Sequence, residues 1–134
     1  MWLVYKTCMK QKRIFIIDER GFSKICSTLL QFEGLSAESF NPDIGAVPLF
    51  GEHDRPGLVI TSYPRCHGFL EDLKKSGVPS VILVDSINGE VLRALEGAVN
   101  SYCMVKPIDY HKFRSIVRGV LEGGMRMEEG YAVV

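Results

Sequence analysis

Charged residues stand directly after apolar runs at three places in this 134-residue sequence. They are Asp18 and Glu19 after IFII (14–17), Asp85 after VILV (81–84), and Lys106 after YCMV (102–105). If these runs are neighbouring strands, three carboxylates and one ammonium group lie in a small volume. Carboxylates packed this closely repel one another unless a cation lies between them. We therefore expect Lys106, or a hard divalent metal such as Mg²⁺, to be the cation of this acidic pocket.

The apolar runs themselves predict buried β-strands. Three of them are rich in Ile and Val and do not alternate with polar residues: 14–17, 58–60 and 81–84. Such runs are typical of strands that are covered on both faces of a parallel sheet. The run at 102–105 is a weaker example, whereas LSAESF (35–40) alternates as an edge strand does. Two hydroxyl residues, Thr61 and Ser62, follow the run at 58–60.

Between the strands, apolar residues recur at intervals of three and four, which predicts amphipathic helices. The four groups are Phe22, Ile25, Leu29 and Phe32; Cys66, Phe69, Leu70 and Leu73; Val91, Ala94, Leu95 and Ala98; and Phe113, Ile116, Val117, Val120 and Leu121. The last helix has the clearest limits, because Pro107 and Asp109 precede it and Gly123 follows it. Segment 41–56 contains three prolines, so its helix should be short or distorted.

Strand and helix alternate about five times, which predicts an α/β fold with a doubly wound parallel sheet. Ligands of such sheets bind outside the carboxyl ends of the strands. The residues that should meet there are Asp18, Glu19, Thr61, Ser62, Asp85 and Lys106. The sequence therefore predicts one shallow polar pocket at this end of the sheet.

Length and composition indicate one ordinary globular domain. The repeating strand–helix pattern places it at 13–123, with an N-terminal extension at 1–12 and a C-terminal tail at 124–134. The last four residues of the tail could add to a sheet edge.

Sixteen basic and sixteen acidic residues balance, which argues against nucleic-acid binding by bulk charge. No apolar run is long enough for a membrane helix. The four cysteines form no metal or disulfide pattern, so we expect reduced thiols in a cytoplasmic protein.

Three stretches resemble the CheY-like receiver domains of two-component response regulators. RIFIIDER (13–20) is similar to the family's opening strand and acidic pair, VKPID (105–109) to its Lys-Pro strand end, and residues 92–121 to its closing helix–strand–helix. The resemblance runs from about Arg13 to Gly123. It implies a flavodoxin-like (βα)₅ fold, with a five-stranded parallel sheet in the order 2-1-3-4-5.

The resemblance also implies a phosphorylation switch. In such domains an Asp at the end of the third strand accepts a phosphoryl group from a sensor kinase, and the acidic pair, here Asp18 and Glu19, holds Mg²⁺. The Lys, here Lys106, contacts the phosphoryl group. A hydroxyl residue after the fourth strand then binds that group, and an aromatic residue three positions before the Lys rotates.

The sequence departs from this pattern at three positions. Ser62 stands where the family has the phosphoacceptor Asp, and no carboxylate lies within five residues of it. Asp85 stands in place of the switch hydroxyl, where a carboxylate would repel a phosphoryl group. Cys103 replaces the switch aromatic, and the nearby Tyr102 belongs to the opposite strand face. We interpret this combination as a domain that no longer uses the phosphorylation switch.

The other pocket residues leave two interpretations open. Asp18 and Glu19 are either a residual Mg²⁺ site or a solvated strand end that is paired with Lys106; no other cofactor is expected. We expect Lys106 to form a salt bridge to Asp18 or Asp85. A fixed pair between Asp85 and Lys106 would lock the domain in one conformation.

The function that these features favour is an atypical, phosphorylation-independent receiver-like domain of a bacterial two-component phosphorelay. It would not be an enzyme and would act through protein–protein interaction, with a sensor kinase, an output protein or a second copy. The dimer would form through the last two helices and the fifth strand, without nucleic acid or membrane.

Two alternatives stay open. One is a receiver that is still phosphorylated on a non-standard carboxylate such as Asp85. The other is a small flavodoxin-like enzyme that uses the strand-end pocket, although the sequence has no Gly-rich phosphate loop and indicates no nucleophile–base pair.

Overall fold

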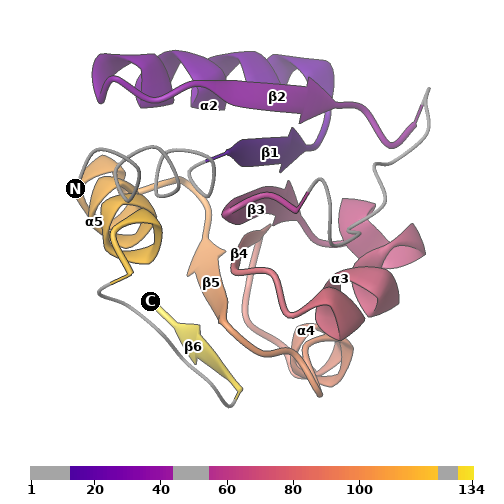
Figure 1. Ribbon diagram of the computed structural model, residues 1–134. Helices are drawn as coiled ribbons and strands as arrows, with labels where there is room; N and C mark the ends of the chain where they lie inside the picture. Colours follow the sequence, from indigo (N-terminus) through magenta and orange to yellow (C-terminus); the bar gives the residue numbers. More distant parts are fainter. Residues whose placement is uncertain (1–12, 44–54, 124–129) are drawn as a thin grey trace.

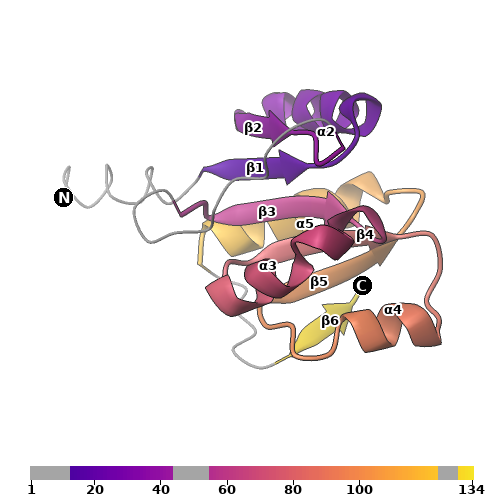
Figure 2. The same ribbon diagram turned by 90° about the vertical axis from the view of Figure 1, so that its right-hand side faces the viewer.

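A six-stranded parallel sheet forms the centre of the computed structural model, which describes residues 13–43, 55–123 and 130–134. The strands are β1 (Ile14–Ile17), β2 (Ala37–Phe40), β3 (Leu58–Ser62), β4 (Ser80–Val84), β5 (Ser101–Val105) and β6 (Tyr131–Val133). Their order is β2-β1-β3-β4-β5-β6, and all neighbours pair in parallel (Figure 1, Figure 2). This confirms the predicted α/β class and the order 2-1-3-4-5, with a sixth strand added beside β5.

The inner strands coincide with the predicted runs because they are buried on both faces. In β1, Ile14 and Ile16 contribute to one hydrophobic cluster, whereas Phe15 and Ile17 contribute to the cluster on the other face. A strand in this position needs apolar residues at successive positions, so it is visible in the sequence as a continuous run. The alternating strand β2 lies at the sheet edge and is only partly buried.

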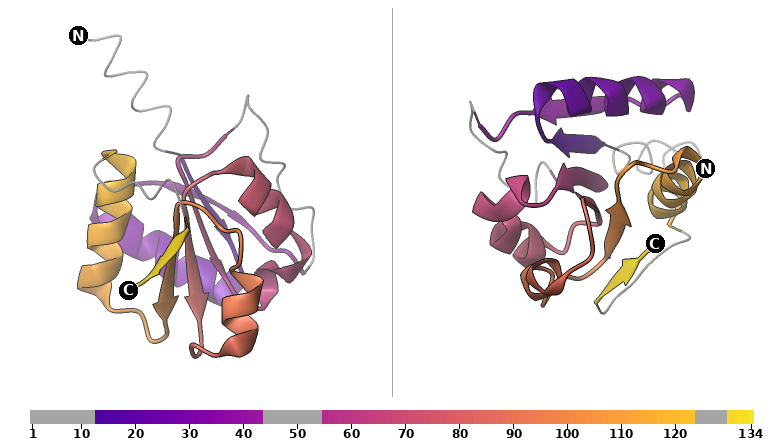
Figure 3. Two further views of the ribbon diagram at one scale, coloured as in Figure 1. Left: turned by 90° about the horizontal axis from the view of Figure 1, so that it is seen from below. Right: turned by 180° about the vertical axis from the view of Figure 1, so that it is seen from behind.

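Helices cover both faces of the sheet. They are α2 (Arg20–Phe32), the 3₁₀ turn η1 (Arg65–Gly68), α3 (Leu70–Ser76), α4 (Gly89–Ala94) and α5 (Tyr110–Leu121). The helices α2 and α5 lie on one face of the sheet, and α3 and α4 lie on the other (Figure 3). The buried side chains of α2 and α5 belong to one hydrophobic cluster, and those of η1, α3 and α4 belong to a second one. None of the helices in the described ranges is long and apolar enough to cross a membrane.

The apolar stripe predicted for α5 is confirmed, since Phe113, Ile116, Val117 and Val120 are all buried. The predicted start is correct too, because the Asp109 side chain accepts a hydrogen bond from the backbone N–H of Lys112. Such a cap satisfies a backbone donor that has no partner within the helix. The sequence pattern therefore located both the limits and the buried face of this helix.

For α2 the predicted helix is correct, but the predicted apolar face is buried only in part: Phe22 packs against the core and Leu29 is partly buried. Ile25 is 61% exposed and Phe32 is 78% exposed, whereas Cys26 and Leu30 are buried beside Ser23. Ser23 can be buried because its hydroxyl donates to the backbone oxygen of Asp18. Ser23 thus occupies a position on the core side of α2, and Ile25 and Phe32 face outward.

Two further helices are shorter than their patterns suggest. The group at 66–73 is split between η1 and α3, which meet at Phe69, and α4 ends at Ala94 although the apolar spacing continues to Ala98. The predicted apolar residues of both helices are still at least partly buried. The shorter helices therefore differ from the prediction in their backbone, and the core contains the predicted residues. Most of the helix expected in 41–56, and the extension at 1–12, lie outside the described residues.

Residues 131–133 form β6, which pairs with β5 in the register Ser101 to Tyr131 and Cys103 to Val133. The backbone N–H of Val134 also donates to the carbonyl oxygen of Cys103. β5 is therefore an inner strand of the sheet, with β6 on its outer side. The expectation that the end of the tail could add to a sheet edge is met, and the sheet is larger than the predicted five strands.

Three cysteines, Cys26, Cys66 and Cys103, are buried and free, as predicted for reduced thiols, while Cys8 lies outside the described residues. Burial raises the pKa of Cys26 and of Cys66 to about 12. Both thiols are therefore protonated at neutral pH and behave as small hydrophobic side chains.

Candidate functional site

The predicted pocket residues lie at the carboxyl end of the sheet. Asp18 follows β1, Ser62 is the last residue of β3, Asp85 follows β4, and Lys106 follows β5. The register places Ile17 beside Thr61 and Val84 beside Val105, so these strand ends are level with one another (Figure 2). The parallel topology therefore gathers the predicted residues at one end of the molecule, but their individual contacts differ.

Asp18 is the centre of the site and is 2% exposed. The hydroxyl of Ser62, also 2% exposed, donates a hydrogen bond to its Oδ2 atom. Its Oδ1 atom accepts a hydrogen bond of 2.7 Å from the backbone N–H of Glu19. A buried carboxylate is stable only where such donors replace water. Ser62 and Glu19 thus fix the position of the Asp18 side chain.

Arg65 supplies the positive charge of this site. Its Nε atom lies 3.6 Å from Oδ1 of Asp18, its Nη2 atom lies 3.1 Å from Oε2 of Glu19, and its Nη1 atom contacts Oδ2 of Asp43. The hydrogen bond to Asp43 raises the pKa of the Arg65 guanidinium above its ordinary value. One side chain therefore bridges the end of β1, the segment after β2 and the turn after β3.

Arg65 was not among the residues selected from the sequence. It stands three positions beyond the end of β3, at the first position of η1. The only signal was a basic residue shortly after a strand end, and many surface arginines occupy such positions. The side chain of Arg65 is long and ends in a planar guanidinium group that can contact several carboxylates at once. Which carboxylates it contacts can be predicted only when the backbone direction of η1 is known.

Lys106 is not the cation of the pocket. It is exposed, and its Nζ atom lies 5.5 Å from the centre of the Phe22 ring, a cation–π contact. Asp85 is exposed too. Among the residues that the structure describes, neither Lys106 nor Asp85 has an oppositely charged partner within 4.0 Å. The predicted salt bridge from Lys106 to Asp18 or Asp85 is therefore wrong. Arg65 of η1 lies beside Asp18 instead, and Lys106 lies against Phe22 of α2.

The other predicted positions belong to the packing of the sheet. Cys103 is buried on the face that α3 and α4 cover, and Tyr102 is buried on the opposite face. Thr61 donates a hydrogen bond of 2.6 Å to the backbone oxygen of Ile17. Position 103 thus holds a small side chain that is enclosed in the core.

The sequence indicated no nucleophile–base pair, but Ser62 and Asp18 are positioned as a hydroxyl and a carboxylate in contact. Both side chains are almost completely buried, and Oδ1 of Asp18 also lies 3.6 Å from Nε of Arg65. A substrate would need access to the Ser62 hydroxyl, and this burial leaves it almost none. The pair is therefore suited to joining β1 and β3, and poorly suited to catalysis.

The oxygens available at this end of the sheet do not fit Mg²⁺ while Arg65 holds its position. Both Asp18 oxygens and one Glu19 oxygen face hydrogen-bond donors or the guanidinium. Within the described ranges, no three His, Cys, Asp or Glu side chains are grouped so that they could hold a metal ion. A divalent cation needs several free oxygens, so it would have to displace the arginine.

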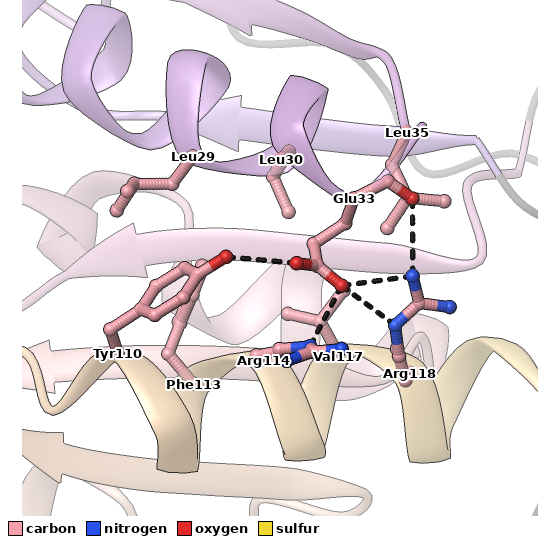
Figure 4. A pocket seen from close by; sticks show the side chains of 9 residues that line it. All are labelled: Leu29, Leu30, Glu33, Leu35, Tyr110, Phe113, Arg114, Val117 and Arg118. Carbon is pink, nitrogen blue, oxygen red and sulfur yellow. Dashed lines mark hydrogen bonds and ion pairs between the residues drawn. The ribbon is translucent and has the colours of Figure 1, made fainter.

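A second polar cluster joins the end of α2 to α5 (Figure 4). The carboxylate of Glu33 accepts a hydrogen bond of 2.8 Å from Tyr110, and the Nε atoms of Arg114 and Arg118 lie 2.8 Å and 2.9 Å from it. The hydrogen bond from Tyr110, followed by the one from Arg118, lowers the pKa of Glu33. The apolar residues Leu29, Leu35 and Val117 surround this cluster. It lies where α2 ends and serves to hold the two helices together.

No protein-family model matches the sequence, and no curated protein sequence matches it. The fold does match solved structures. A two-component response regulator from Clostridium difficile is 19% identical with a TM-score of 0.65, and the match covers 84% of this chain and 97% of that one. A CheY-like response regulator receiver domain protein from Methanospirillum hungatei JF-1 is 17% identical with a TM-score of 0.63, over 84% and 95%. The Mn²⁺-bound form of the response regulator Rcp1 is 20% identical with a TM-score of 0.55, over 81% and 91%.

These similarities extend over most of the chain and define its architecture. The protein has the fold of a CheY-like receiver domain, as the resemblance in RIFIIDER and VKPID implied. At this level of identity the match speaks for the fold alone, and the use of the strand-end site must be argued from its own residues.

Proposed function

We propose that this chain is an atypical receiver-like domain of a two-component signalling system, which acts through protein–protein contacts and does not depend on phosphorylation. The observation that carries this proposal is the hydrogen bond from Ser62 to Asp18. Ser62, at the end of β3, is buried, and its hydroxyl group already donates a hydrogen bond to the Asp18 carboxylate. It is therefore not available as a phosphoacceptor.

The surroundings of Ser62 support the same function. A serine attacks a phosphorus atom only if a base removes its proton, and the Asp18 carboxylate beside it is engaged by Arg65. A phosphoryl group at this place would also approach Asp85, whose negative charge opposes it. The lysine that would neutralise the transferred group lies over Phe22.

The contacts by which such a domain would signal involve the last two helices and the edge of the sheet. The partners that we propose are a sensor kinase, an output protein or a second copy of the chain, in the cytoplasm. Because β6 pairs with the outer side of β5, a dimer that forms on this side would meet β6 together with α4 and α5. Sedimentation of the purified chain over a range of concentrations tests the dimer directly.

Beryllofluoride, which imitates an acyl phosphate on an Asp, tests the proposal in the presence of Mg²⁺. We expect the amide NMR signals of Asp18, Ser62 and Lys106 to stay unchanged when it is added. A receiver domain that has Asp at the end of its third strand is the positive control in the same solutions. Saturable shifts of these three signals would refute the proposal, because they would show that the pocket binds the phosphoryl analogue.

A second candidate function has one observation in its favour. Asp85 is exposed and, among the described residues, has no charged partner, so its carboxylate is free to react. Incubation with acetyl phosphate and Mg²⁺, followed by intact-mass measurement, tests this alternative. The addition of one phosphoryl group that is lost in Asp85→Asn, but kept in Asp109→Asn, would establish Asp85 as the acceptor.

A further inference from the structure

β2 is an edge strand, and its outer side has no neighbouring strand in the described part of the chain. Its inner side pairs with β1, and the backbone N–H of Asp18 donates to the carbonyl oxygen of Phe40. Backbone groups of successive strand residues point in opposite directions, so the N–H and C=O groups of Ser39 point away from β1. An edge of this kind can pair with a further strand.

A groove of about 650 Å³ lies between β2 and α2, which run side by side (Figure 1). Ser39 lines this groove and pairs in register with Ile16, which is fully buried on the face of the sheet that α2 covers. Paired residues point to the same face, yet Ser39 is exposed. α2 therefore leaves the outer part of β2 uncovered, and the space is large enough for a ligand.

The side chains that line the groove are mostly uncharged hydrogen-bonding groups. Those of Ser27, Gln31 and Ser39 have no hydrogen-bond partner among the described residues, so they are available to a ligand. An extended peptide carries donors and acceptors along its whole length and matches such a lining. An apolar helix does not, because Phe40 is the one large apolar residue among the described residues of the groove.

The groove is also positively charged. Arg20 and Lys24 of α2 line it, and within the described ranges neither has a carboxylate within 4.0 Å. Of the described lining residues only Asp18 is acidic, and its Oδ1 atom lies 3.6 Å from Nε of Arg65. A ligand with a carboxylate group is therefore complementary to the groove, whereas a second copy of the chain would bring the same positive charges to it.

We propose that the groove between α2 and β2 binds an extended, acidic segment of a partner protein, which adds as a strand to the outer edge of β2. The backbone of the segment pairs with Ala37–Phe40, and its carboxylate lies beside Arg20 and Lys24. This contact surface lies at the opposite edge of the sheet from β6. It goes beyond the proposed function and involves no phosphoryl group, so either proposal can fail while the other stands.

Selection of peptides on the immobilised full chain, from a phage-displayed library of random twelve-residue sequences, tests the proposal. We expect the enriched peptides to contain Asp or Glu beside residues that favour strands, such as Val, Ile and Thr. Synthetic copies of them should shift the amide NMR signals of Ser27, Ser39 and Asn41 in a saturable manner. The proposal is overturned if no acidic peptide is enriched, or if the enriched peptides shift the signals of α4 and α5 instead.

Substitutions separate the contribution of charge from that of the strand edge. Arg20→Gln combined with Lys24→Gln should weaken the binding of a selected peptide by about three- to thirtyfold, the range for two exposed ion pairs. Lys112→Gln is the matched control, because it removes an exposed lysine from α5, and it should not change the affinity. Equal weakening by the control would contradict a specific role of the two α2 cations.

Ser39→Pro removes the outward N–H of β2, a substitution that edge strands tolerate, and should abolish binding. Should this variant not fold, N-methylation of the selected peptide at alternate backbone amides gives the same information with the wild-type chain. Methylation of one edge of the peptide should weaken binding by about tenfold or more, since a hydrogen-bonded strand pairs through one edge, and methylation of the other edge should not. Equal binding of both methylated peptides would rule out strand addition.

Discussion

The hydroxyl of Ser62 donates a hydrogen bond to the Asp18 carboxylate and so joins the end of β3 to the end of β1. Both residues are buried, and Asp18 has few other donors: the backbone N–H of Glu19 and the nearby guanidinium of Arg65. A buried charge that loses a donor is costly, because water cannot replace it. The stability of this end of the sheet should therefore depend on a single hydroxyl group.

Ser62→Ala is expected to lower the free energy of unfolding by about 1.5–3 kcal/mol, the range for a hydrogen bond to a charged group. Urea denaturation measures this value. Ser80→Ala is the matched control, since Ser80 is buried in the neighbouring strand and shares a hydrogen bond of 2.9 Å with the neutral Ser101. Its loss should be smaller, about 0.5–1.5 kcal/mol. Equal losses would mean that the Asp18 charge gives the Ser62 hydrogen bond no additional strength.

The cluster around Glu33 should make stability depend on pH. Its hydrogen bonds from Tyr110 and Arg118 lower its pKa below the ordinary value of 4.5. A carboxyl group with a lowered folded-state pKa stabilises the protein above its unfolded-state pKa, and this contribution is lost as the pH falls through the folded-state value. Glu33→Gln should thus be less stable than the wild type at pH 7, and the difference should shrink below pH 4.5.

Melting temperatures of the wild type and Glu33→Gln, measured from neutral to acidic pH, check this expectation. Glu38→Gln is a suitable control, because Glu38 forms an exposed ion pair with Arg13, and such pairs contribute little. A difference for Glu33→Gln that does not vary with pH would argue that the carboxylate charge is not what holds α5 to α2.

Asp85→Ala should leave stability almost unchanged, within about 0.5 kcal/mol, as is usual for exposed residues. This expectation follows from the exposure of Asp85 and from the absence of an ion pair to Lys106 in the described part of the chain. It reverses what a fixed Asp85–Lys106 pair would predict. A loss of more than about 1 kcal/mol in chemical denaturation would show that Asp85 has a structural role after all.

The two sides of α2 should respond very differently to truncation. Leu30 is 2% exposed, so Leu30→Ala should lower the free energy of unfolding by about 2–5 kcal/mol. Phe32 is larger but mostly exposed, and Phe32→Ala should change it by no more than about 0.5 kcal/mol. Denaturation of the two variants under the same conditions tests the orientation of α2, and a larger loss for Phe32→Ala would contradict it.

The sequence was most informative where burial is complete. The strands were located to within two residues because positions such as Ile16 and Ile60 are enclosed on both sides, and only apolar residues are suitable there. The buried face of α2 was predicted only in part because Ser23, whose hydroxyl is satisfied by a backbone oxygen, occupies a core position that hydrophobicity alone would give to Ile25. A local hydrogen bond thus overrode the apolar pattern.

The candidate site could be predicted in part. The strand ends and the parallel topology brought Asp18, Glu19 and Ser62 together as expected. The cation was missed because the reach of a long side chain is set by the turn that carries it. Arg65 is near Ser62 in the chain, but its contact with Asp43 joins positions 22 residues apart. Such a pairing depends on the path of the backbone, which residue types alone do not determine.

The position of Arg65 has a practical consequence. A guanidinium that belongs to the polypeptide is present once in every molecule from the moment of synthesis, and neither dialysis nor a chelator can remove it. Because Arg65 faces the carboxylates of Asp18 and Glu19, the positive charge that balances them is inherited with the chain.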